Sequence, residues 1–216
     1  MDLIIASNNA AKVREIKQMV QERKLPLCVR SLKDAGICID VDETGTTFEE
    51  NARIKAEAIR DLMIEKGQQD NTLIMADDSG LCVDALDGAP GVFSARYGGE
   101  GMTDIQRYQK LLGALDNTPE GKRTARFVCS ICLIYPVTQK TNCPVTLFNG
   151  ICEGIIARGP SGDNGFGYDP IFYLPQFQKT MAELSSVEKN EISHRGNAIR
   201  LMLQELCVKM EDNAQI

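Results

Sequence analysis

A short apolar run followed by two adjacent acids constrains this chain more than any other feature. Residues 73–76, Leu-Ile-Met-Ala, predict a buried strand, because a short apolar run between turn signals is typical of one. Asp77 and Asp78 follow directly, and Ser79 with Gly80 predicts a turn that ends the strand. Ligands of α/β proteins bind at the carboxyl ends of strands, so we expect a binding site here.

The two acids predict a site for a divalent cation. Adjacent carboxylates repel each other unless a proton or a cation is present. Carboxylate oxygens are ligands that Mg²⁺ accepts readily. An ordinary solvated turn over residues 77–80 remains an alternative, because Asp, Ser and Gly are also common turn residues.

Length, composition and charge limit the class of protein. The 216 residues, of which 43% are hydrophobic, can bury a sizeable core in one domain, 1–216, or in two lobes that share it. No run of 18 or more apolar residues is present, and the N-terminus does not resemble a signal peptide, so we expect a cytoplasmic protein that enters no membrane. The net charge of -6 argues against a nucleic-acid partner.

The eight cysteines do not predict a disulfide framework. Cys129 and Cys132 have the spacing of a redox motif, but they lie in an apolar, β-rich segment without an exposed turn. A single histidine and the absence of a second CxxC motif leave a zinc site short of ligands. We therefore expect reduced, mostly buried thiols.

The N-terminal segment predicts a strand, a polar turn and a helix. Residues 3–6 predict the strand and residues 11–21 the helix, joined by a turn at residues 7–9. Free N–H groups and the positive end of the helix dipole would face a ligand above this turn, and Lys12 adds a full charge, so phosphate fits. A helix capped by Asn with a solvated Lys12 is the alternative.

The rest of the chain alternates further strands and helices, without repeats or long linkers. The predicted strands are 28–31, 37–41, 124–135 and 145–158, the last two joined by a polar hairpin at 136–144. The predicted helices are 48–66, 102–115 and a C-terminal helix whose apolar stripe includes Ile199, Met202, Leu203, Leu206 and Met210. A capping box of Thr47 with Glu50 begins the first of these helices.

Three polar residues near residues 48–66 are candidates for the same site. Glu43 precedes the helix and is placed to supply an oxygen ligand. Asn51 and Lys55 are one helical turn apart, so they share a face and could reach that site together as substrate contacts. Taken singly, each is also compatible with an ordinary surface position.

A glycine-rich loop at residues 161–170 is a candidate base-binding segment. Its three glycines allow the backbone to approach a flat ligand, and Phe166 and Tyr168 offer rings that could stack on a base. Asp169 could accept a hydrogen bond from a base or a sugar. A turn that simply buries its rings is the alternative.

The only histidine precedes the C-terminal helix. His194 lies beside Arg195 and close in sequence to Lys189, outside the apolar stripe. These cations favour a binding role toward an anionic or carbonyl-bearing ligand, whereas a surface histidine is the plain alternative.

Five stretches, taken together and in this order, resemble the inosine triphosphate pyrophosphatase family, the Ham1-like house-cleaning nucleotidases. They are SNNAAKVREI, ETGTTFEENARIKAEA, ADDSGLCVDALDGAPGVFSARYGG, GFGYDPIF and EKNEISHRGNA. The resemblance implies an elongated, two-lobed α/β fold with a long central mixed sheet flanked by helices, an active-site cleft between the lobes, and a homodimer. It also implies Mg²⁺-dependent hydrolysis of ITP, dITP and XTP to the monophosphate and pyrophosphate.

The same resemblance assigns roles to residues of this chain. The triphosphate-binding turn would be Ser7, Asn8, Asn9, Ala10, Ala11 and Lys12; the metal ligands Glu43 and Asp78; the base-binding loop Phe166, Gly167, Tyr168 and Asp169; and further substrate contacts Ser79, Lys189, His194 and Arg195. Asp78 would also activate the attacking water, and the division of metal and base roles between Asp77 and Asp78 stays open. Asn8 departs from the Gly or Thr of many members.

The chemistry of the residues agrees with that assignment. A nucleoside triphosphate carries about four negative charges, so an acid-lined site accepts it only with a divalent ion between them. A donor such as Arg195 or His194 near the 6-keto oxygen would favour hypoxanthine and xanthine over adenine. A Maf-like pyrophosphatase of modified pyrimidine triphosphates and a non-catalytic nucleotide-binding module are the alternatives, which a substrate panel separates.

Overall fold

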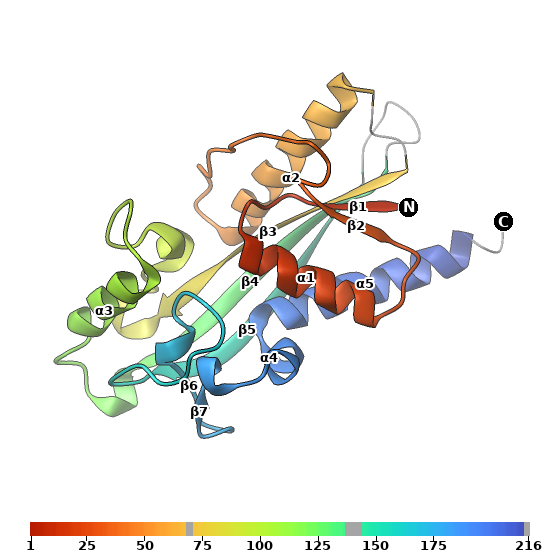
Figure 1. The fold of residues 1–216 in the computed structure, drawn as a ribbon. Coiled ribbons are helices and arrows are strands. Elements are labelled where there is room, and N and C mark those ends of the chain that lie inside the picture. The colour runs from red at the N-terminus through yellow and green to blue at the C-terminus, as the bar shows by residue number, and fades with distance from the viewer. Residues whose placement is uncertain (68–70, 137–143, 214–216) are drawn as a thin grey trace. The chain divides into compact units, whose positions relative to one another are not determined.

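The structure, a computed structural model, describes residues 1–67, 71–136 and 144–213. Within these residues, one sheet of seven strands has the order β2-β1-β3-β4-β5-β6-β7 (Figure 1). The strands are β1 Asp2–Ile5, β2 Cys28–Ser31, β3 Thr72–Val83, β4 Thr124–Ile134, β5 Val145–Ile156, β6 Phe172–Leu174 and β7 Lys179–Thr180. β1 is parallel to β2 and β3, whereas β6 is antiparallel to β5 and β7, so the sheet is mixed.

Five α-helices accompany the sheet in the described residues, which confirms the predicted α/β class. They are α1 Ala10–Glu22, α2 Phe48–Glu65, α3 Asp104–Ala114, α4 Ser186–Ile192 and α5 His194–Asn213. Polar caps fix where they begin: the Asn9 side chain accepts from the first N–H groups of α1, and Thr47 with Glu50 forms the predicted capping box of α2. None of the helices in these ranges is both long and apolar enough to cross a membrane.

The chain divides into two compact units. Unit 1 comprises Met1–Asp78, Ser130–Asn149 and Ala198–Ile216, and unit 2 comprises Ser79–Cys129 and Gly150–Asn197. Strands β3, β4 and β5 each contribute residues to both units. The single domain over 1–216, the elongated shape and the cleft that the resemblance implies stay predictions.

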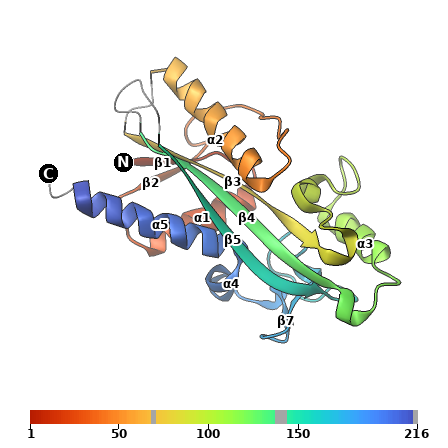
Figure 2. The same ribbon diagram turned by 180° about the vertical axis from the view of Figure 1, so that it is seen from behind.

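In unit 1 the sheet has helices on both faces. Side chains on one helical stripe of α2 pack against every second residue of the strands, as strand geometry requires. The members of this cluster include Ile4, Ala6, Ala52, Ala56, Ile59, Met63, Ile74, Ala76, Cys132 and Ile134. α1 and α5 lie on the opposite face of the strands from α2 (Figures 1 and 2). The two sheet faces of unit 1 are therefore covered by different helices.

The core of unit 2 joins α3 to the strands and to the segment after β5. Phe127 and Phe172 pack with ring centroids 4.5 Å apart, and Tyr108 and Leu111 of α3 are buried in the same cluster. The helical spacing of Ile105 with Tyr108 and Leu111 predicts that it shares their core face, but Ile105 is 55% exposed, so this prediction is wrong. The ranges of β1, β2, β4, β5, α1, α2 and α3 agree closely with the predicted ones, because their apolar periodicity matches the buried face, whereas β6, β7 and α4 were not predicted.

The segment around the paired acids differs from the prediction. β3 does not end at Ala76 but continues through Asp77 and Asp78 to Val83, so no turn lies at Ser79 and Gly80. The pairing of β3 with its neighbours in the sheet, β1 and β4, outweighs the local turn preference of Asp, Ser and Gly. Successive strand residues point to opposite faces, which separates the two carboxylates.

Two further predictions were the strand at residues 37–41 and the hairpin at residues 136–144. Residues 37–41 form no strand, because only Ile37 is buried there and no neighbouring strand pairs with them. Most of the predicted hairpin, residues 137–143, lies outside the described residues. The described cysteines are all free, as predicted, but only Cys129, Cys132 and Cys152 among them are buried, so the prediction of mostly buried thiols was wrong.

Candidate active site

One ammonium group joins two of the predicted acids in unit 1. Lys55 Nζ lies 2.8 Å from Glu43 Oε1 and 3.1 Å from Asp78 Oδ1. Asp78 lies on β3 and Lys55 lies on α2. The Asp78 side chain is on the face of the strands that α2 covers. The structure therefore brings together Glu43, Lys55 and Asp78, three residues that the sequence places more than ten positions apart.

Asp77 belongs to a separate ion pair. Its Oδ2 lies 3.0 Å from Lys12 Nζ in the first turn of α1. Asp77 and Asp78 thus contact helices on opposite faces of the sheet, and they lie in a strand instead of at the predicted turn; a metal-binding role of Asp77 stays a prediction. Glu43 and Asp78 remain together, whereas Asp77 is held by Lys12.

The turn before α1 has the Asn cap of the alternative prediction, although Lys12 pairs with Asp77 and is not solvated, and an anion site at this turn stays a prediction. Asn9 Oδ1 accepts from the N–H groups of Ala11 and Lys12, and the Asn9 N–H donates to Ser7 Oγ. The positive end of α1 and the Lys12 ammonium are therefore concentrated at this turn. Asn8 and Ala10 are exposed beside them.

Burial and charge act in opposite directions on the two central groups. Burial raises the pKa of Asp78 above its ordinary value, although Lys55 and Lys12 oppose the shift. Burial alone would lower the pKa of Lys55, but the charges of Asp78, Asp77 and Glu43 raise it overall. Lys55 is therefore held as an ammonium, and Asp78 is a stronger proton acceptor than an exposed aspartate.

Asn51 is fully buried between these groups. Its Nδ2 donates to Asp78 Oδ2 at 3.3 Å, and its Oδ1 accepts from the Gly45 N–H at 2.8 Å. The prediction placed Asn51 on the same helical face as Lys55, which the structure confirms. Its side chain contacts protein groups on both sides.

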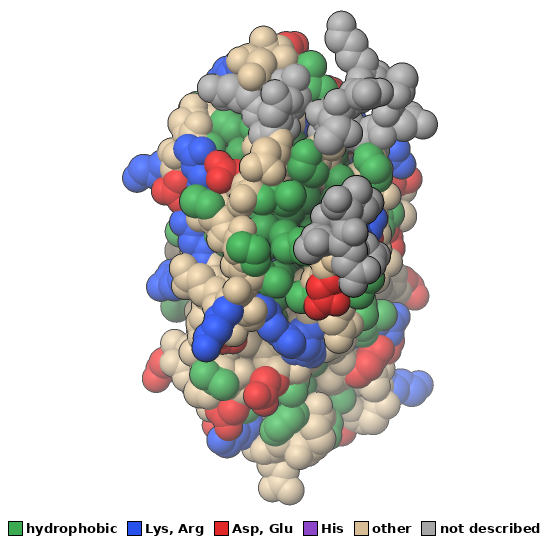
Figure 3. All heavy atoms as spheres, turned by 90° about the vertical axis from the view of Figure 1, so that its right-hand side faces the viewer, with side chains coloured by type: hydrophobic (Ala, Val, Ile, Leu, Met, Phe, Trp, Pro, Cys, Tyr) green, Lys and Arg blue, Asp and Glu red, His purple; other side chains and the backbone are tan. Residues whose placement is uncertain are grey.

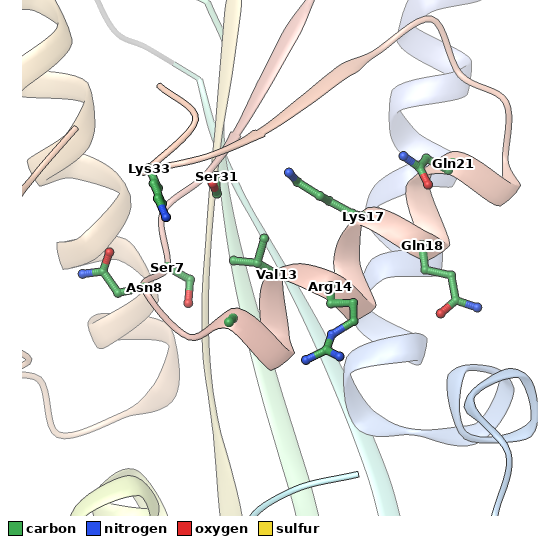
Figure 4. Close-up of a pocket in the computed structure, with 10 residues that line it drawn as sticks. Ser7, Asn8, Val13, Arg14, Lys17, Gln18, Gln21, Ser31 and Lys33 are labelled. Atoms are coloured by element: carbon green, nitrogen blue, oxygen red, sulfur yellow. The ribbon is translucent and has the colours of Figure 1, made fainter. Parts of the chain in front are cut away.

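A pocket of about 560 Å³ lies along α1, next to the same turn (Figure 4). Ser7 and Asn8 line one end of it, and Val13 lies between Lys17 and Lys33. Arg14 is the third basic residue of its lining, and none of the described lining residues is acidic. Lys17, however, pairs with Asp34 at 2.6 Å, so its positive charge is compensated.

The donor set fits a hard divalent cation that is shared with a ligand. No group of three or more His, Cys, Asp or Glu in the described residues is arranged to hold a metal by itself. Glu43 and Asp78, however, direct carboxylate oxygens at one positively charged point, the Lys55 nitrogen. Mg²⁺ is typically bound by one or two carboxylates together with phosphate oxygens and water, so these two residues suit it.

A second group of predicted residues lies together in unit 2, around the Phe166 ring. Lys189 Nζ is 4.9 Å and Arg195 Cζ 5.7 Å from the centroid of this ring. Arg195 also donates to Ser79 Oγ at 3.0 Å. An aromatic face bordered by two cations suits an electron-rich, carbonyl-bearing base.

Asp169 and Tyr168 stabilise the glycine-rich loop at residues 161–170 through buried hydrogen bonds. Asp169 Oδ2 accepts from the Phe166 N–H at 2.9 Å and from Lys189 Nζ at 2.8 Å. The Tyr168 ring is buried in the core, and its hydroxyl donates to the Ser94 carbonyl at 2.9 Å. Of the two predicted stacking rings, only that of Phe166 lies outside the core cluster.

His194 is buried instead of lying on the surface. Its ring stacks on Phe127 with centroids 4.7 Å apart and an interplanar angle of 14°, and only 5% of the residue is exposed. The plain alternative of a surface histidine was therefore wrong. The stacking fixes the ring plane at the start of α5.

Sequence reasoning missed one residue that contacts the predicted loop. Asp104, at the start of α3, accepts from the Gly167 N–H at 2.8 Å and pairs with Arg107. The same turn lines a pocket of about 370 Å³ with Phe166. Its only sequence signal is the capping pattern of Thr103 with Gln106, which predicts a helix start but not the loop contact.

The molecular surface carries both signs of charge. On the face drawn in Figure 3, Lys and Arg side chains are interspersed with Asp and Glu. The concentrated charges described above are therefore local features of the two residue groups.

The fold defines an α/β protein whose Glu43 and Asp78 carboxylates share the Lys55 ammonium. The sequence profile described as the Ham1 family matches residues 3–205. The chain is 48% identical over 203 residues to a dITP/XTP pyrophosphatase of Clostridium perfringens, covering 94% of this chain and 96% of the relative. It is 46% identical over 204 residues to a dITP/XTP pyrophosphatase of Bacillus cereus, covering 94% of each.

A solved structure agrees with the sequence relatives. The Staphylococcus aureus Ham1 protein has a TM-score of 0.80 and 42% identity, covering 97% of this chain and 100% of the other. This chain therefore belongs to the Ham1 family.

Proposed function

We propose that this protein hydrolyses dITP and XTP, and also ITP, to the nucleoside monophosphate and pyrophosphate, and so removes aberrant purine nucleotides. Relatives with nearly half of their residues identical are dITP/XTP pyrophosphatases. The observation that carries the proposal is the contact of Lys55 with both Glu43 and Asp78, because it combines acidic oxygens and a buried cation in one place.

The phosphate chain is bound by unit 1 in this proposal. Lys12, Lys55 and the positive end of the α1 dipole supply positive charge for phosphate oxygens. Lys12 and the helix N-terminus then stabilise the negative charge that develops on the departing pyrophosphate.

Glu43 and Asp78 are the residues that would hold Mg²⁺. When bound, this ion would neutralise phosphate charge and lower the pKa of a water molecule. Magnesium dependence is part of the proposal, and it rests on the oxygen donors of these two side chains.

Asp78 is the proposed proton acceptor. A water oxygen forms a bond to the α-phosphorus, the bond from that phosphorus to the bridging oxygen breaks, and the proton of the water passes to an oxygen of Asp78. Its raised pKa makes the carboxylate more basic than an exposed aspartate. Lys55, only 3.1 Å away, keeps the carboxylate ionised before the reaction.

The base is bound in this proposal by residues of unit 2. The Phe166 ring offers a stacking surface, and Arg195 donates to the 6-keto oxygen of hypoxanthine or xanthine. Adenine presents an amino group at that position, and an unpaired buried donor costs about 1–3 kcal/mol, or about 5- to 150-fold in preference. His194 is fixed on Phe127 and is a second candidate donor.

A substrate panel tests the proposal. Pyrophosphate release is measured from dITP, XTP, ITP, GTP, ATP and modified pyrimidine triphosphates, with Mg²⁺ and with a chelator. We expect rapid release from the first three and only with Mg²⁺. Preference for pyrimidines would favour a Maf-like activity, and binding without release would favour a non-catalytic module.

A cytoplasmic location and a homodimer also belong to the proposal. The first follows from a substrate that occurs in the nucleotide pool, and the second from the resemblance to the family. Light scattering after size-exclusion chromatography tests the dimer, since a mass near that of one chain would contradict it.

A further inference from the structure

We propose that Asn51 is a positioning residue, which ties the Asp78 carboxylate to the segment that carries Glu43. This inference rests on the proposed function, and it replaces the expectation that Asn51 contacts the substrate. The side chain is fully buried and makes hydrogen bonds to protein groups at both of its polar atoms.

The amide of Asn51 links two parts of the chain that are distant in sequence. Nδ2 donates to Asp78 Oδ2 at 3.3 Å, and Oδ1 accepts from the Gly45 N–H at 2.8 Å. Gly45 follows Glu43 by two residues, so the second bond anchors the segment on which Glu43 lies.

The orientation of the amide follows from its partners. A backbone N–H can only donate, so the atom that faces Gly45 is the oxygen. The NH₂ group is then directed to Asp78, which can accept because its carboxylate is ionised by the nearby ammonium groups.

A second link between the same two acids depends on charge. Lys55 Nζ contacts Glu43 Oε1 and Asp78 Oδ1, the oxygen of Asp78 that Asn51 does not use. A cation that binds to these carboxylates competes with the Lys55 ammonium for them. The Asn51 link is neutral and uses other atoms, so it can hold Asp78 in place through that change.

Asparagine is suited to this position by shape and by chemistry. Aspartate has the same shape but cannot donate to Asp78, and leucine can neither donate nor accept. The approach is also close: a Cβ added at Gly45 would lie 2.7 Å from Asn51 Oδ1 and 2.7 Å from Glu50 Cβ. Gly45→Ala therefore disturbs the same link from its other end.

The test compares Asn51→Leu, Asn51→Asp and Gly45→Ala with wild type. In steady state with XTP and Mg²⁺, we expect kcat to fall about 10-fold or more in each variant, because a hydrogen bond to a charged group is lost or strained. KM for XTP should change by less than about threefold, because no substrate contact is removed. A rise in KM with an unchanged kcat would overturn the proposal and make Asn51 a substrate contact.

Two readouts do not depend on turnover. Calorimetric titration of the nucleotide-free Asn51→Leu protein with MgCl₂ should show binding about 10-fold weaker than in wild type. Hydrogen exchange of the Gly45 amide should be faster in Asn51→Leu than in Asn51→Asp, which keeps an acceptor for it. Unchanged Mg²⁺ binding and unchanged exchange in Asn51→Leu would overturn the proposal.

Asn149→Leu is the matched control. Asn149 Nδ2 donates to Glu49 Oε1 at 3.0 Å, so the variant also removes an Asn–carboxylate hydrogen bond at the start of α2, but at an exposed position. We expect kcat, Mg²⁺ binding and Gly45 exchange as in wild type; equal losses in the control would overturn the specific role of Asn51. If wild type releases no pyrophosphate from XTP, the proposed function fails, whereas the titration and exchange still test the link.

Discussion

Removing the Lys189 ammonium tests whether its buried ion pair with Asp169 stabilises the glycine-rich loop at residues 161–170. Lys189 Nζ lies 2.8 Å from Asp169 Oδ2, and both side chains are less than a tenth exposed. Asp169 also accepts from the Phe166 N–H, so its carboxylate joins the loop to α4. Lys189→Met leaves this carboxylate buried without its ammonium partner.

The expected loss of stability is large. Leaving one partner of a buried ion pair uncompensated costs about 3–5 kcal/mol, out of a total of about 5–15 kcal/mol for a typical domain. In urea unfolding at 25 °C the midpoint should fall by about 1–2 M. Asp169→Asn combined with Lys189→Met removes both charges, and this double variant should be more stable than Lys189→Met alone.

The control is an exposed ion pair. Arg53 and Glu57 form a salt bridge on the surface of α2, so Arg53→Met should leave the midpoint close to that of wild type. A double variant of Lys189 and Asp169 as unstable as the sum of the two single variants would refute the reasoning, because it would show no coupling between the charges.

Two other perturbations test base recognition and the buried thiols. Arg195→Ala should lower the ratio of kcat/KM for XTP to that for ATP by about 5- to 150-fold, and an unchanged ratio would assign base recognition elsewhere. Burial raises the pKa of Cys132 to about 12 and that of Cys152 to about 11, from 9.0. Above pH 9 the unfolded thiols ionise while the folded ones keep their protons, so the free energy of unfolding falls as pH rises. Urea unfolding at pH 8 and pH 10 should show a smaller fall in a Cys132→Ala, Cys152→Ala variant, by up to about 1.4 kcal/mol per thiol per pH unit, and equal falls would contradict this reasoning.

Local sequence signals predicted the longer helices α1, α2, α3 and α5 and the strands β1, β2, β4 and β5, but not α4, β6 or β7. The capping box of Thr47 with Glu50 and the Asn9 cap mark helix starts through contacts within three residues, which a sequence displays directly. The continuation of β3 through Asp77 and Asp78 was missed, because pairing with distant strands outweighs the turn preference of those residues.

The contacts among the candidate site residues depend on hydrogen bonds between residues far apart in the sequence. Asn51 and Asp78 are 27 positions apart, and Tyr168 and Ser94 are 74 apart, so no local pattern reveals their hydrogen bonds. Polar residues that resemble ligands in the sequence can therefore make buried hydrogen bonds to protein groups in the structure, as Asn51 does.

The position of bond cleavage tests the central claim most directly. XTP is hydrolysed with Mg²⁺ in water enriched in ¹⁸O, and the products are analysed by mass spectrometry. If water attacks the α-phosphorus beside Asp78, one ¹⁸O atom enters the monophosphate and none enters the pyrophosphate. Label in the pyrophosphate, or release of orthophosphate in its place, would contradict the account.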